Sequence, residues 1–177
     1  NGICDKLIRR HPHIYGDTLA ENEATVKANW EQIKLKEKGN TSVLGGVPRS
    51  LPALVKAMRI QEKASGVGFD WENGNQVWDK VEEEIKEFKA ETQVETVNSQ
   101  RKNEEFGDVL FSLINYARFQ DINPEEVLER TNKKFIKRFQ YLERASKREG
   151  KSLAEMTLSE MDIYWEEAKK NEKIRRF

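Results

Sequence analysis

The amino-acid sequence predicts an all-α protein, because its composition, apolar spacing and capping residues all suit helices. Charged residues make up 35% of the 177-residue chain and aromatic residues 9%, with only four Pro and ten Gly. That balance favours long charged helices over sheets. No stretch shows the alternation of apolar and polar residues that marks a half-buried strand. We expect a four-helix bundle from residue 50 onward, behind an N-terminal helical appendage.

Start and stop signals divide the chain into helices. A short helix ends near Arg9, and a second covers about 22–38. Ser50 is a suitable N-cap with Pro52 in the first turn, so a third helix covers about 50–65. The remaining helices are expected at about 76–91, 98–120, 123–148 and 157–173. These lengths suit a bundle of antiparallel neighbours.

The last two helices have the clearest end signals. Asn123 is a good N-cap and Pro124 is preorganised for the first helical position. Gly150 is a natural stop for the helix that Asn123 opens. Thr157 and Glu160 have the spacing of a capping box, in which each side chain binds the backbone amide of the other.

Charge and cysteine content exclude several classes of protein. Lys plus Arg and Asp plus Glu each number 31, so the net charge is zero and a general nucleic-acid binder is disfavoured. The single cysteine, Cys4, excludes an intrachain disulfide framework and fits a reducing compartment. No apolar run approaches the ~20 residues that span a bilayer. We therefore expect a cytoplasmic protein that binds neither nucleic acid nor membranes.

Two pairs of carboxylates are the most informative residues. Glu84 and Glu87 lie in VEEEIKEF, and Glu105 and Asp108 lie in EEFGDVLF. Each pair is spaced i, i+3, so its members share one face of a helix. Two such pairs on facing helices can hold hard divalent cations such as Mg²⁺, which prefer oxygen ligands.

The helix expected at 98–120 carries a polar stripe on an otherwise apolar surface. Such a helix is usually buried. Its stripe consists of Glu105, Asp108, Ser112 and Asn115. A buried carboxylate needs a partner, and a metal ion would supply one. The alternative is a solvated acidic face paired with Lys and Arg. Gly107, beside the stripe, predicts a close approach of another helix at that turn.

Basic residues complement the acids. Lys134 and Arg138 are spaced i, i+4, and Lys80 lies one turn before Glu84. Phosphate oxygens need such cations, because metal ions alone rarely neutralise a triphosphate. Ordinary surface bases are the alternative interpretation of all three side chains.

Several aromatic and histidine side chains also invite a functional interpretation. Phe69, Trp71 and Trp165 could stack on a nucleobase. We interpret them as core or lid packing residues. His11 and His13 flank a proline, but no Cys or His cluster completes a zinc site, so we interpret them as structural.

The acidic motifs and their flanks resemble the MazG family of nucleoside triphosphate pyrophosphohydrolases. The family's EExxE and ExxD motifs correspond to Glu83–Glu87 and Glu105–Asp108. The resemblance covers nearly the whole chain, through the further stretches RRHPHIYGD, NWEQIK, VPRSLPAL, GVGFDW and NKKFIKRF. It implies an all-α, four-helix-bundle-like MazG fold that holds Mg²⁺, with Mn²⁺ as an alternative. It also implies Mg²⁺-dependent cleavage of NTPs or dNTPs to the monophosphate and pyrophosphate.

The resemblance also implies residue roles. The metal ligands would be Glu84, Glu87, Glu105 and Asp108. Glu83 or Glu84 would orient the attacking water as general base, and Lys80 would assist by contacting phosphate. Lys134 and Arg138 would also contact the phosphates. The nucleotide pocket would be lined by Asn115, Trp165 and Lys169.

The same resemblance implies a domain organisation. Residues 1–45 look like the end of a first MazG domain and a linker, and 46–177 like a catalytic MazG domain. We therefore expect one active site per chain and a homodimer, since apolar helix faces remain to be covered. A nucleotide-binding or helical interaction protein without catalysis is the alternative function.

Overall fold

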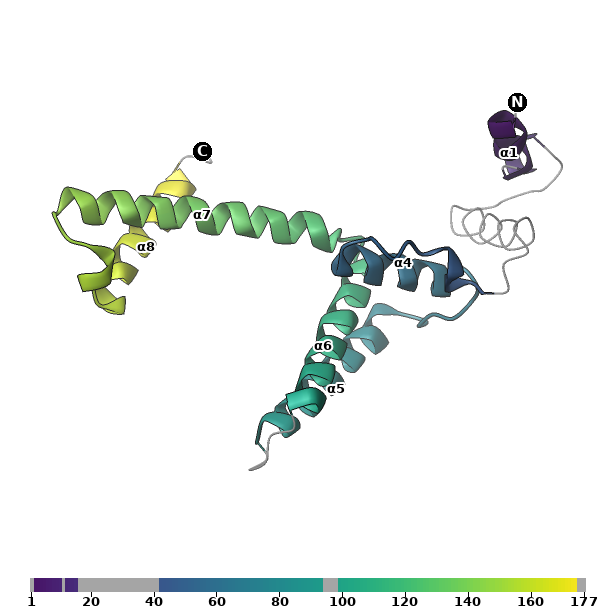
Figure 1. Ribbon diagram of the computed structural model, residues 1–177, viewed down its shortest axis with the longest axis horizontal. Coiled ribbons are helices and arrows are strands. Elements are labelled where there is room, and N and C mark those ends of the chain that lie inside the picture. Colours follow the sequence, from purple (N-terminus) through teal and green to yellow (C-terminus); the bar gives the residue numbers. More distant parts are fainter. Residues whose placement is uncertain (1, 11, 16–41, 94–98, 175–177) are drawn as a thin grey trace. The chain divides into compact units, whose positions relative to one another are not determined.

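The computed structural model describes residues 2–10, 12–15, 42–93 and 99–174 (Figure 1). Its longer helices are α4 (Ala53–Ser65), α5 (Gly74–Gln93), α6 (Ser99–Phe119), α7 (Pro124–Arg148) and α8 (Leu158–Ile174). Its shorter elements are α1 (Gly2–Arg10), α2 (Pro12–Tyr15) and the 3₁₀ turns η1 (Leu44–Gly46) and η2 (Leu153–Glu155). The described ranges contain helices and no strand, which confirms the all-α prediction. The helix expected at 22–38 lies outside them.

The chain divides into two compact units, Asn1–Pro124 and Glu125–Phe177. The first contains α4, α5 and α6, and the second contains α7 and α8. Three helices of the expected bundle thus share one unit, and the helix expected at 123–148 belongs to the other. The four-helix arrangement and the domain boundary near residue 45 stay predictions. In the described ranges, no helix combines the length and apolar character needed to cross a membrane.

The helices α5 and α6 form an antiparallel pair, which is the main packing contact of the first unit. Trp78 near the start of α5 meets Tyr116 near the end of α6, with ring centroids 4.9 Å apart. Phe88 and Phe106 meet toward the opposite ends, at 5.3 Å. Val81, fully buried on α5, lies between these two ring contacts. This pairing brings the two acidic motifs onto facing helices.

The helix α4 and the loop after it are tied to α6 by polar contacts. Gln61 Nε2 donates a hydrogen bond of 2.8 Å to the backbone oxygen of Phe111. Gly68 has φ +87°, a conformation that L side chains rarely adopt. At this loop the chain turns back, and the Phe69 amide donates to the Ala64 oxygen at 3.0 Å. The loop is thereby folded against the end of α4.

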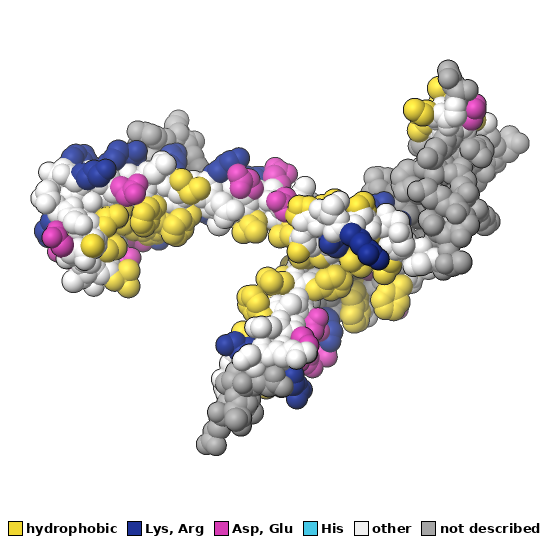
Figure 2. Space-filling view, viewed as in Figure 1, with side chains coloured by type: hydrophobic (Ala, Val, Ile, Leu, Met, Phe, Trp, Pro, Cys, Tyr) yellow, Lys and Arg dark blue, Asp and Glu magenta, His cyan; other side chains and the backbone are white. Residues whose placement is uncertain are grey.

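The surface of α6 differs from the prediction that the helix is buried nearly all round. Val109 and Ile114 are buried, but Phe106 and Leu110 are each 48% exposed. Hydrophobic side chains accordingly reach the surface of both units (Figure 2). The prediction of a close approach at Gly107 is also wrong in the described part of the chain, where an added Cβ would meet no atom within 4 Å. The helix α6 is therefore only partly covered within its unit.

The second unit is held together by contacts between α7 and α8. Arg138 donates to a carboxylate oxygen of Glu172 at 2.8 Å, and the ring of Phe135 lies 5.0 Å from that of Trp165. The buried residues of this unit include Leu142, Ala145, Met156 and Ala168. These contacts orient the inner face of α7 toward α8.

Most predicted helix ends are close to the observed ones. The capping box of Thr157 and Glu160 is confirmed, because each backbone amide donates to the other side chain, at 2.8 and 3.3 Å. Gly150 follows the end of α7 with φ +71°. Ser50 as N-cap is wrong, since Pro52 occupies that position without a side-chain cap. The fixed φ of proline favours the turn into the helix without a capping hydroxyl.

Candidate functional site

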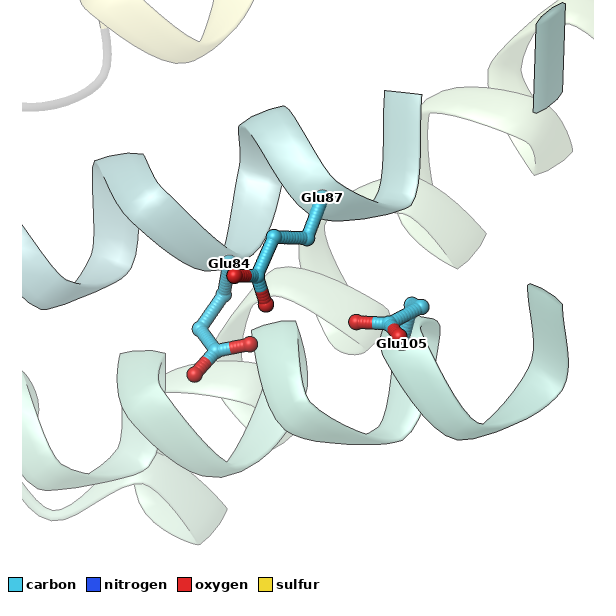
Figure 3. A group of neighbouring side chains, drawn as sticks. All are labelled: Glu84, Glu87 and Glu105. Atoms are coloured by element: carbon cyan, nitrogen blue, oxygen red, sulfur yellow. The ribbon is translucent and has the colours of Figure 1, made fainter. Parts of the chain in front are cut away.

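Three carboxylates from α5 and α6 converge on one point. One oxygen from each of Glu84, Glu87 and Glu105 can be chosen so that all three lie within 4.8 Å of one another. Figure 3 shows Glu84 and Glu87 reaching from α5 toward α6, and Glu105 pointing back to them. Their i, i+3 spacing and the antiparallel helix pair together produce this arrangement. Three oxygen donors of this kind suit a hard divalent cation.

The electrostatics of this acidic group reflect crowding of like charges. Partial loss of hydration, followed by the negative charges of Glu87 and Asp108, raises the pKa of Glu105 above its ordinary value. The charge of Glu84 acts in the same direction, and Arg101 opposes it. Carboxylates that repel one another favour a proton or a cation among them. The chemistry of the donors therefore fits a divalent metal ion.

Lys80 is the nearest basic partner that the structure gives the acidic group. Its ammonium lies 2.9 Å from carboxylate oxygens of both Glu83 and Glu84. Hydrogen bonds from the ammonium to these two carboxylates raise the pKa of Lys80. The amine is therefore protonated at neutral pH and acts as a cation, not as a proton acceptor. Glu83 itself is exposed and lies outside the group of three converging oxygens.

A cavity of about 390 Å³ adjoins the acidic group within the first unit. Glu84 and Asp108 both line it, and Ser112 and Asn115 continue its wall along α6. The predicted polar stripe therefore faces this cavity through three of its four members. Asp108 is exposed, so the expectation that both acids of the stripe are buried is wrong. The cavity has the size of a small-molecule site.

The end of the cavity away from the acids is organised by an ion pair. The two terminal guanidinium nitrogens of Arg118 donate to the two carboxylate oxygens of Asp70, at 2.9 and 2.5 Å. Burial on its own would raise the pKa of Asp70, but the hydrogen bonds from Arg118, Ser65 and the Trp71 amide, together with the charge of Arg118, lower that pKa. Arg118 also donates to the side-chain oxygen of Asn115, at 3.1 and 2.9 Å. These bonds orient the Asn115 amide at the cavity wall.

Two of the aromatic residues border the cavity. Phe69 is 82% exposed, and Trp71 is also exposed on the same loop. Both line the cavity, so the core interpretation is wrong for them and the lid interpretation remains. Trp165 lies in the second unit, where it packs on Phe135, as the packing interpretation predicts.

The remaining predicted substrate contacts lie on the second unit. Arg138 binds Glu172, and its guanidinium lies 5.8 Å from the centre of the Trp165 ring. Lys169 binds Glu166 at 2.5 Å, and Lys134 is exposed on α7. The roles of these side chains toward a substrate stay predictions. The side chains of His11 and His13 lie outside the part of the chain that the structure describes.

Sequence reasoning missed three cavity residues, Gln61, Asp70 and Arg118. One signal was present for Arg118, because it lies three residues after Asn115 and extends the polar stripe by one helical turn. Asp70 stands within the GVGFDW stretch, but its partner is 48 residues away. Nothing in the sequence around Gln61 separates it from a surface glutamine on α4.

Comparison with known proteins identifies the family. A model of the MazG nucleotide pyrophosphohydrolase domain matches residues 74–142, which include α5, α6 and most of α7. The nucleoside triphosphate pyrophosphohydrolase of Escherichia coli is 42% identical over 179 residues, covering 97% of this chain and 68% of that protein. The chain belongs to the MazG family. All four predicted metal ligands lie within the matched MazG region.

Two further relatives are similar to this chain over most of its length. The nucleoside triphosphate pyrophosphohydrolase/pyrophosphatase MazG of Thermotoga maritima is 42% identical over 94% of this chain and 63% of its own length. The uncharacterised protein YabN of Bacillus subtilis is 49% identical over 97% of this chain and 35% of its own length. The chain thus spans about two thirds of the named MazG enzymes and about a third of YabN.

Proposed function

We propose that this protein is a Mg²⁺-dependent nucleoside triphosphate pyrophosphohydrolase, which converts NTPs or dNTPs to the monophosphate and pyrophosphate. The observation that carries the proposal is the convergence of Glu84, Glu87 and Glu105 within 4.8 Å, beside a cavity of about 390 Å³. The relatives from E. coli and T. maritima are named as nucleoside triphosphate pyrophosphohydrolases, which supports the reaction class. A metal site next to a nucleotide-sized cavity is what such an enzyme requires.

The balance of charge explains why this site needs a cation. A triphosphate brings about four negative charges to a place already occupied by carboxylates, so binding without a counter-ion is unfavourable. Glu84, Glu87, Glu105 and Asp108 would hold Mg²⁺, with Mn²⁺ as an alternative. The bound metal would supply Lewis-acid stabilisation of charge on the phosphate oxygens.

The protein's own groups then bind and orient the substrate. Lys80, kept protonated by its two carboxylate partners, would donate to a phosphate oxygen at the edge of the acidic group. Glu83 or Glu84 would accept a proton from the attacking water. Both carboxylates contact the Lys80 ammonium, which would hold the phosphate beside them. Asn115 and the aromatic loop would line the part of the cavity that receives the nucleoside.

The second unit offers further candidate phosphate contacts. Lys134 on α7 is exposed, and Arg138 presents a guanidinium paired with one carboxylate. We propose that both bind the phosphate tail, with Trp165 and Lys169 near the nucleoside, in the assembled enzyme. The Arg138 guanidinium can bind a phosphate in bidentate fashion, so exchange of Glu172 for a phosphate oxygen is chemically reasonable.

A homodimer is part of the proposal. The apolar side chains Phe106, Leu110 and Leu113 are exposed on α6, at 39% or more. Contiguous exposed apolar surface of this kind usually marks an interaction site, and a second copy is the commonest partner. Light scattering coupled to gel filtration gives the mass in solution, and a strictly monomeric mass at micromolar concentration would remove this part of the proposal.

Product analysis tests the reaction. The full chain is incubated with each common NTP and dNTP, with Mg²⁺ and then with EDTA, and the products are separated by chromatography. We expect NMP and pyrophosphate with metal and neither product with EDTA. Running the reaction in ¹⁸O water then shows which product carries the label and so which phosphorus is attacked.

Two other outcomes would each name a different function. NDP and orthophosphate would mean that the terminal phosphate is removed, and the proposed reaction would be wrong. Absence of turnover, with nucleotide still raising the melting temperature, would favour the alternative of a nucleotide-binding or helical interaction protein without catalysis.

A further inference from the structure

Gln61 is a buried polar side chain in the cavity with a spare acceptor. The residue is 6% exposed and lines the cavity wall between α4 and α6. Its Nε2 donates to the Phe111 backbone oxygen at 2.8 Å. Its Oε1 is buried and has no hydrogen-bond partner in the part of the chain that the structure describes. Such an acceptor is costly to leave unpaired, so a partner that binds there is strongly favoured.

The orientation of the amide is fixed by its neighbours. Turning it over would direct Oε1 at the Phe111 carbonyl oxygen, and two acceptors would then face each other. The next residue, Ser112, is also buried, and its hydroxyl donates to the Val109 oxygen at 2.9 Å. The Ser112 oxygen is therefore left to accept. At Gln61 and Ser112 the cavity wall therefore offers two acceptors, while the Ser112 hydroxyl and one N–H of Gln61 already donate to backbone oxygens.

The position of Gln61 separates it from the metal chemistry. Gln61 contacts Phe111, which lies about one turn of α6 after Asp108, in the direction of Asn115 and Arg118. The axial rise of a helix is about 1.5 Å per residue. The surrounding wall includes Val77, Phe111 and the aromatic loop at Phe69 and Trp71. Apolar and aromatic walls suit the face of a nucleobase, and a single polar group among them determines which base edge fits.

We infer that Gln61 is a specificity-determining residue, whose Oε1 accepts a hydrogen bond from an exocyclic amino group of the substrate's base. The inference rests on the proposed function for the existence of a nucleotide substrate. An amino group presents two N–H donors to the two acceptors, whereas the imide N–H of uracil or thymine is flanked by carbonyl oxygens on both sides. Because Oε1 is sealed from water, making this bond requires a slight shift of the Gln61 side chain toward the cavity.

Three pairs of triphosphates, each differing by one amino group, test the inference. The pairs are ATP with purine riboside triphosphate, GTP with ITP, and CTP with pyrimidin-2-one riboside triphosphate. Pyrophosphate release gives kcat and KM for each nucleotide with the wild-type chain and with Gln61→Met, which keeps the size of the side chain but removes its polar atoms. The control Glu62→Met places the same side chain one position along, at an exposed site.

In wild type and the control, we expect the amino-bearing member of at least one pair to have a KM lower by about tenfold to a hundredfold. The kcat values should stay close, because the base lies away from the reacting phosphorus. In Gln61→Met the two members of that pair should become nearly equal. A wild-type chain that treats all three pairs alike would overturn the inference, whether or not Gln61→Met folds. Discrimination that survives in Gln61→Met would overturn it as well.

A binding experiment separates this inference from the proposed function. The α,β-methylene analogues of the same nucleotides resist cleavage at the bond in question, and their dissociation constants are measured by calorimetry. If no nucleotide releases pyrophosphate, the proposed function fails. The same dependence of affinity on the amino group and on Gln61 would still support the inference. Equal affinities for both members of every pair would reject it.

Discussion

Two charged regions of the molecule use carboxylates in opposite ways. Between α5 and α6, acids gather with like charges, and the pKa of Glu105 is raised by lost hydration and by its acidic neighbours. In the second unit, Glu160 binds Lys151 at 2.8 Å and the Thr157 amide, and these contacts lower its pKa from 4.5 to about 2. The two carboxylates therefore differ in their partners.

The difference shows how to separate a binding site from a structural ion pair. In the second unit Glu160 meets both a cation and a helix N-terminus, so its ionisation supports the fold. At Glu105 ionisation opposes the fold until a cation arrives. An acidic motif therefore indicates ligand binding when its charges converge without being neutralised, and indicates stability when each charge is already paired.

The largest effect that we expect is a loss of turnover when a carboxylate of the acidic group is replaced by alanine. Glu87→Ala or Asp108→Ala should lower kcat/KM by at least about a hundredfold, because each removes a proposed metal ligand. Both side chains are exposed, so the variants should fold normally. Circular dichroism and pyrophosphate release measure the two properties on the same samples.

Glu129→Ala is the matched control for this prediction. Glu129 lies on α7 in an exposed pair with Lys133, at 3.2 Å. Exposed pairs contribute little to stability, so neither the melting temperature nor the turnover should change appreciably. Wild-type turnover in either Glu87→Ala or Asp108→Ala would contradict the assignment of these acids as metal ligands.

The sequence predicts the helices well because their ends are decided locally. The helix expected at 76–91 is observed at Gly74–Gln93, and the one expected at 98–120 is observed at Ser99–Phe119. The i, i+3 spacing also determines which acids share a face. That three of the acids converge then follows from the antiparallel pairing of the two helices, which their short connection favours.

The remaining parts of the site depend on contacts distant in sequence. Asp70 and Arg118 are 48 residues apart, and neither has a local signal that predicts the other. The buried state of Gln61 depends on the seating of α4 against α6. The exposure of Phe106 and Leu110 could not be predicted from their apolar character, because periodicity shows which side chains share a face and not what covers that face.

A second, intermediate effect compares the same substitution in the two regions. Without metal, Glu105→Gln should leave the melting temperature unchanged or raise it, because it removes one of several repelling charges. Glu160→Gln should lower the melting temperature, since it removes the ion pair with Lys151 and replaces the charged acceptor of the capping box by a neutral amide oxygen. Differential scanning fluorimetry in EDTA gives both values.

Adding Mg²⁺ completes this experiment. In wild type and in Glu160→Gln, Mg²⁺ at about a hundred times its dissociation constant should stabilise the fold by about 2.7 kcal/mol. In Glu105→Gln the Mg²⁺ titration should shift to higher concentration. A marked fall in the melting temperature of metal-free Glu105→Gln would mean that this carboxylate has a structural role instead.

The smallest expected effect is a pH dependence of opposite sign in the two regions. The folded pKa of Glu160 is about 2 against an ordinary value of 4.5, so its contribution to stability is fully present above pH 4.5 and is lost between 4.5 and 2. The folded pKa of Glu105 is raised, so the metal-free protein gains stability as pH falls through that pKa toward 4.5.

Urea unfolding midpoints in EDTA, measured from pH 7 to 2.5, distinguish these two pH dependences. The advantage of wild type over Glu160→Gln should shrink below pH 4.5, whereas wild type should gain on Glu105→Gln as pH falls toward 4.5. Two variants that respond to acid with the same sign would show that the carboxylates of α5 and α6 are neutralised in the metal-free protein, and the contrast between the regions would be lost.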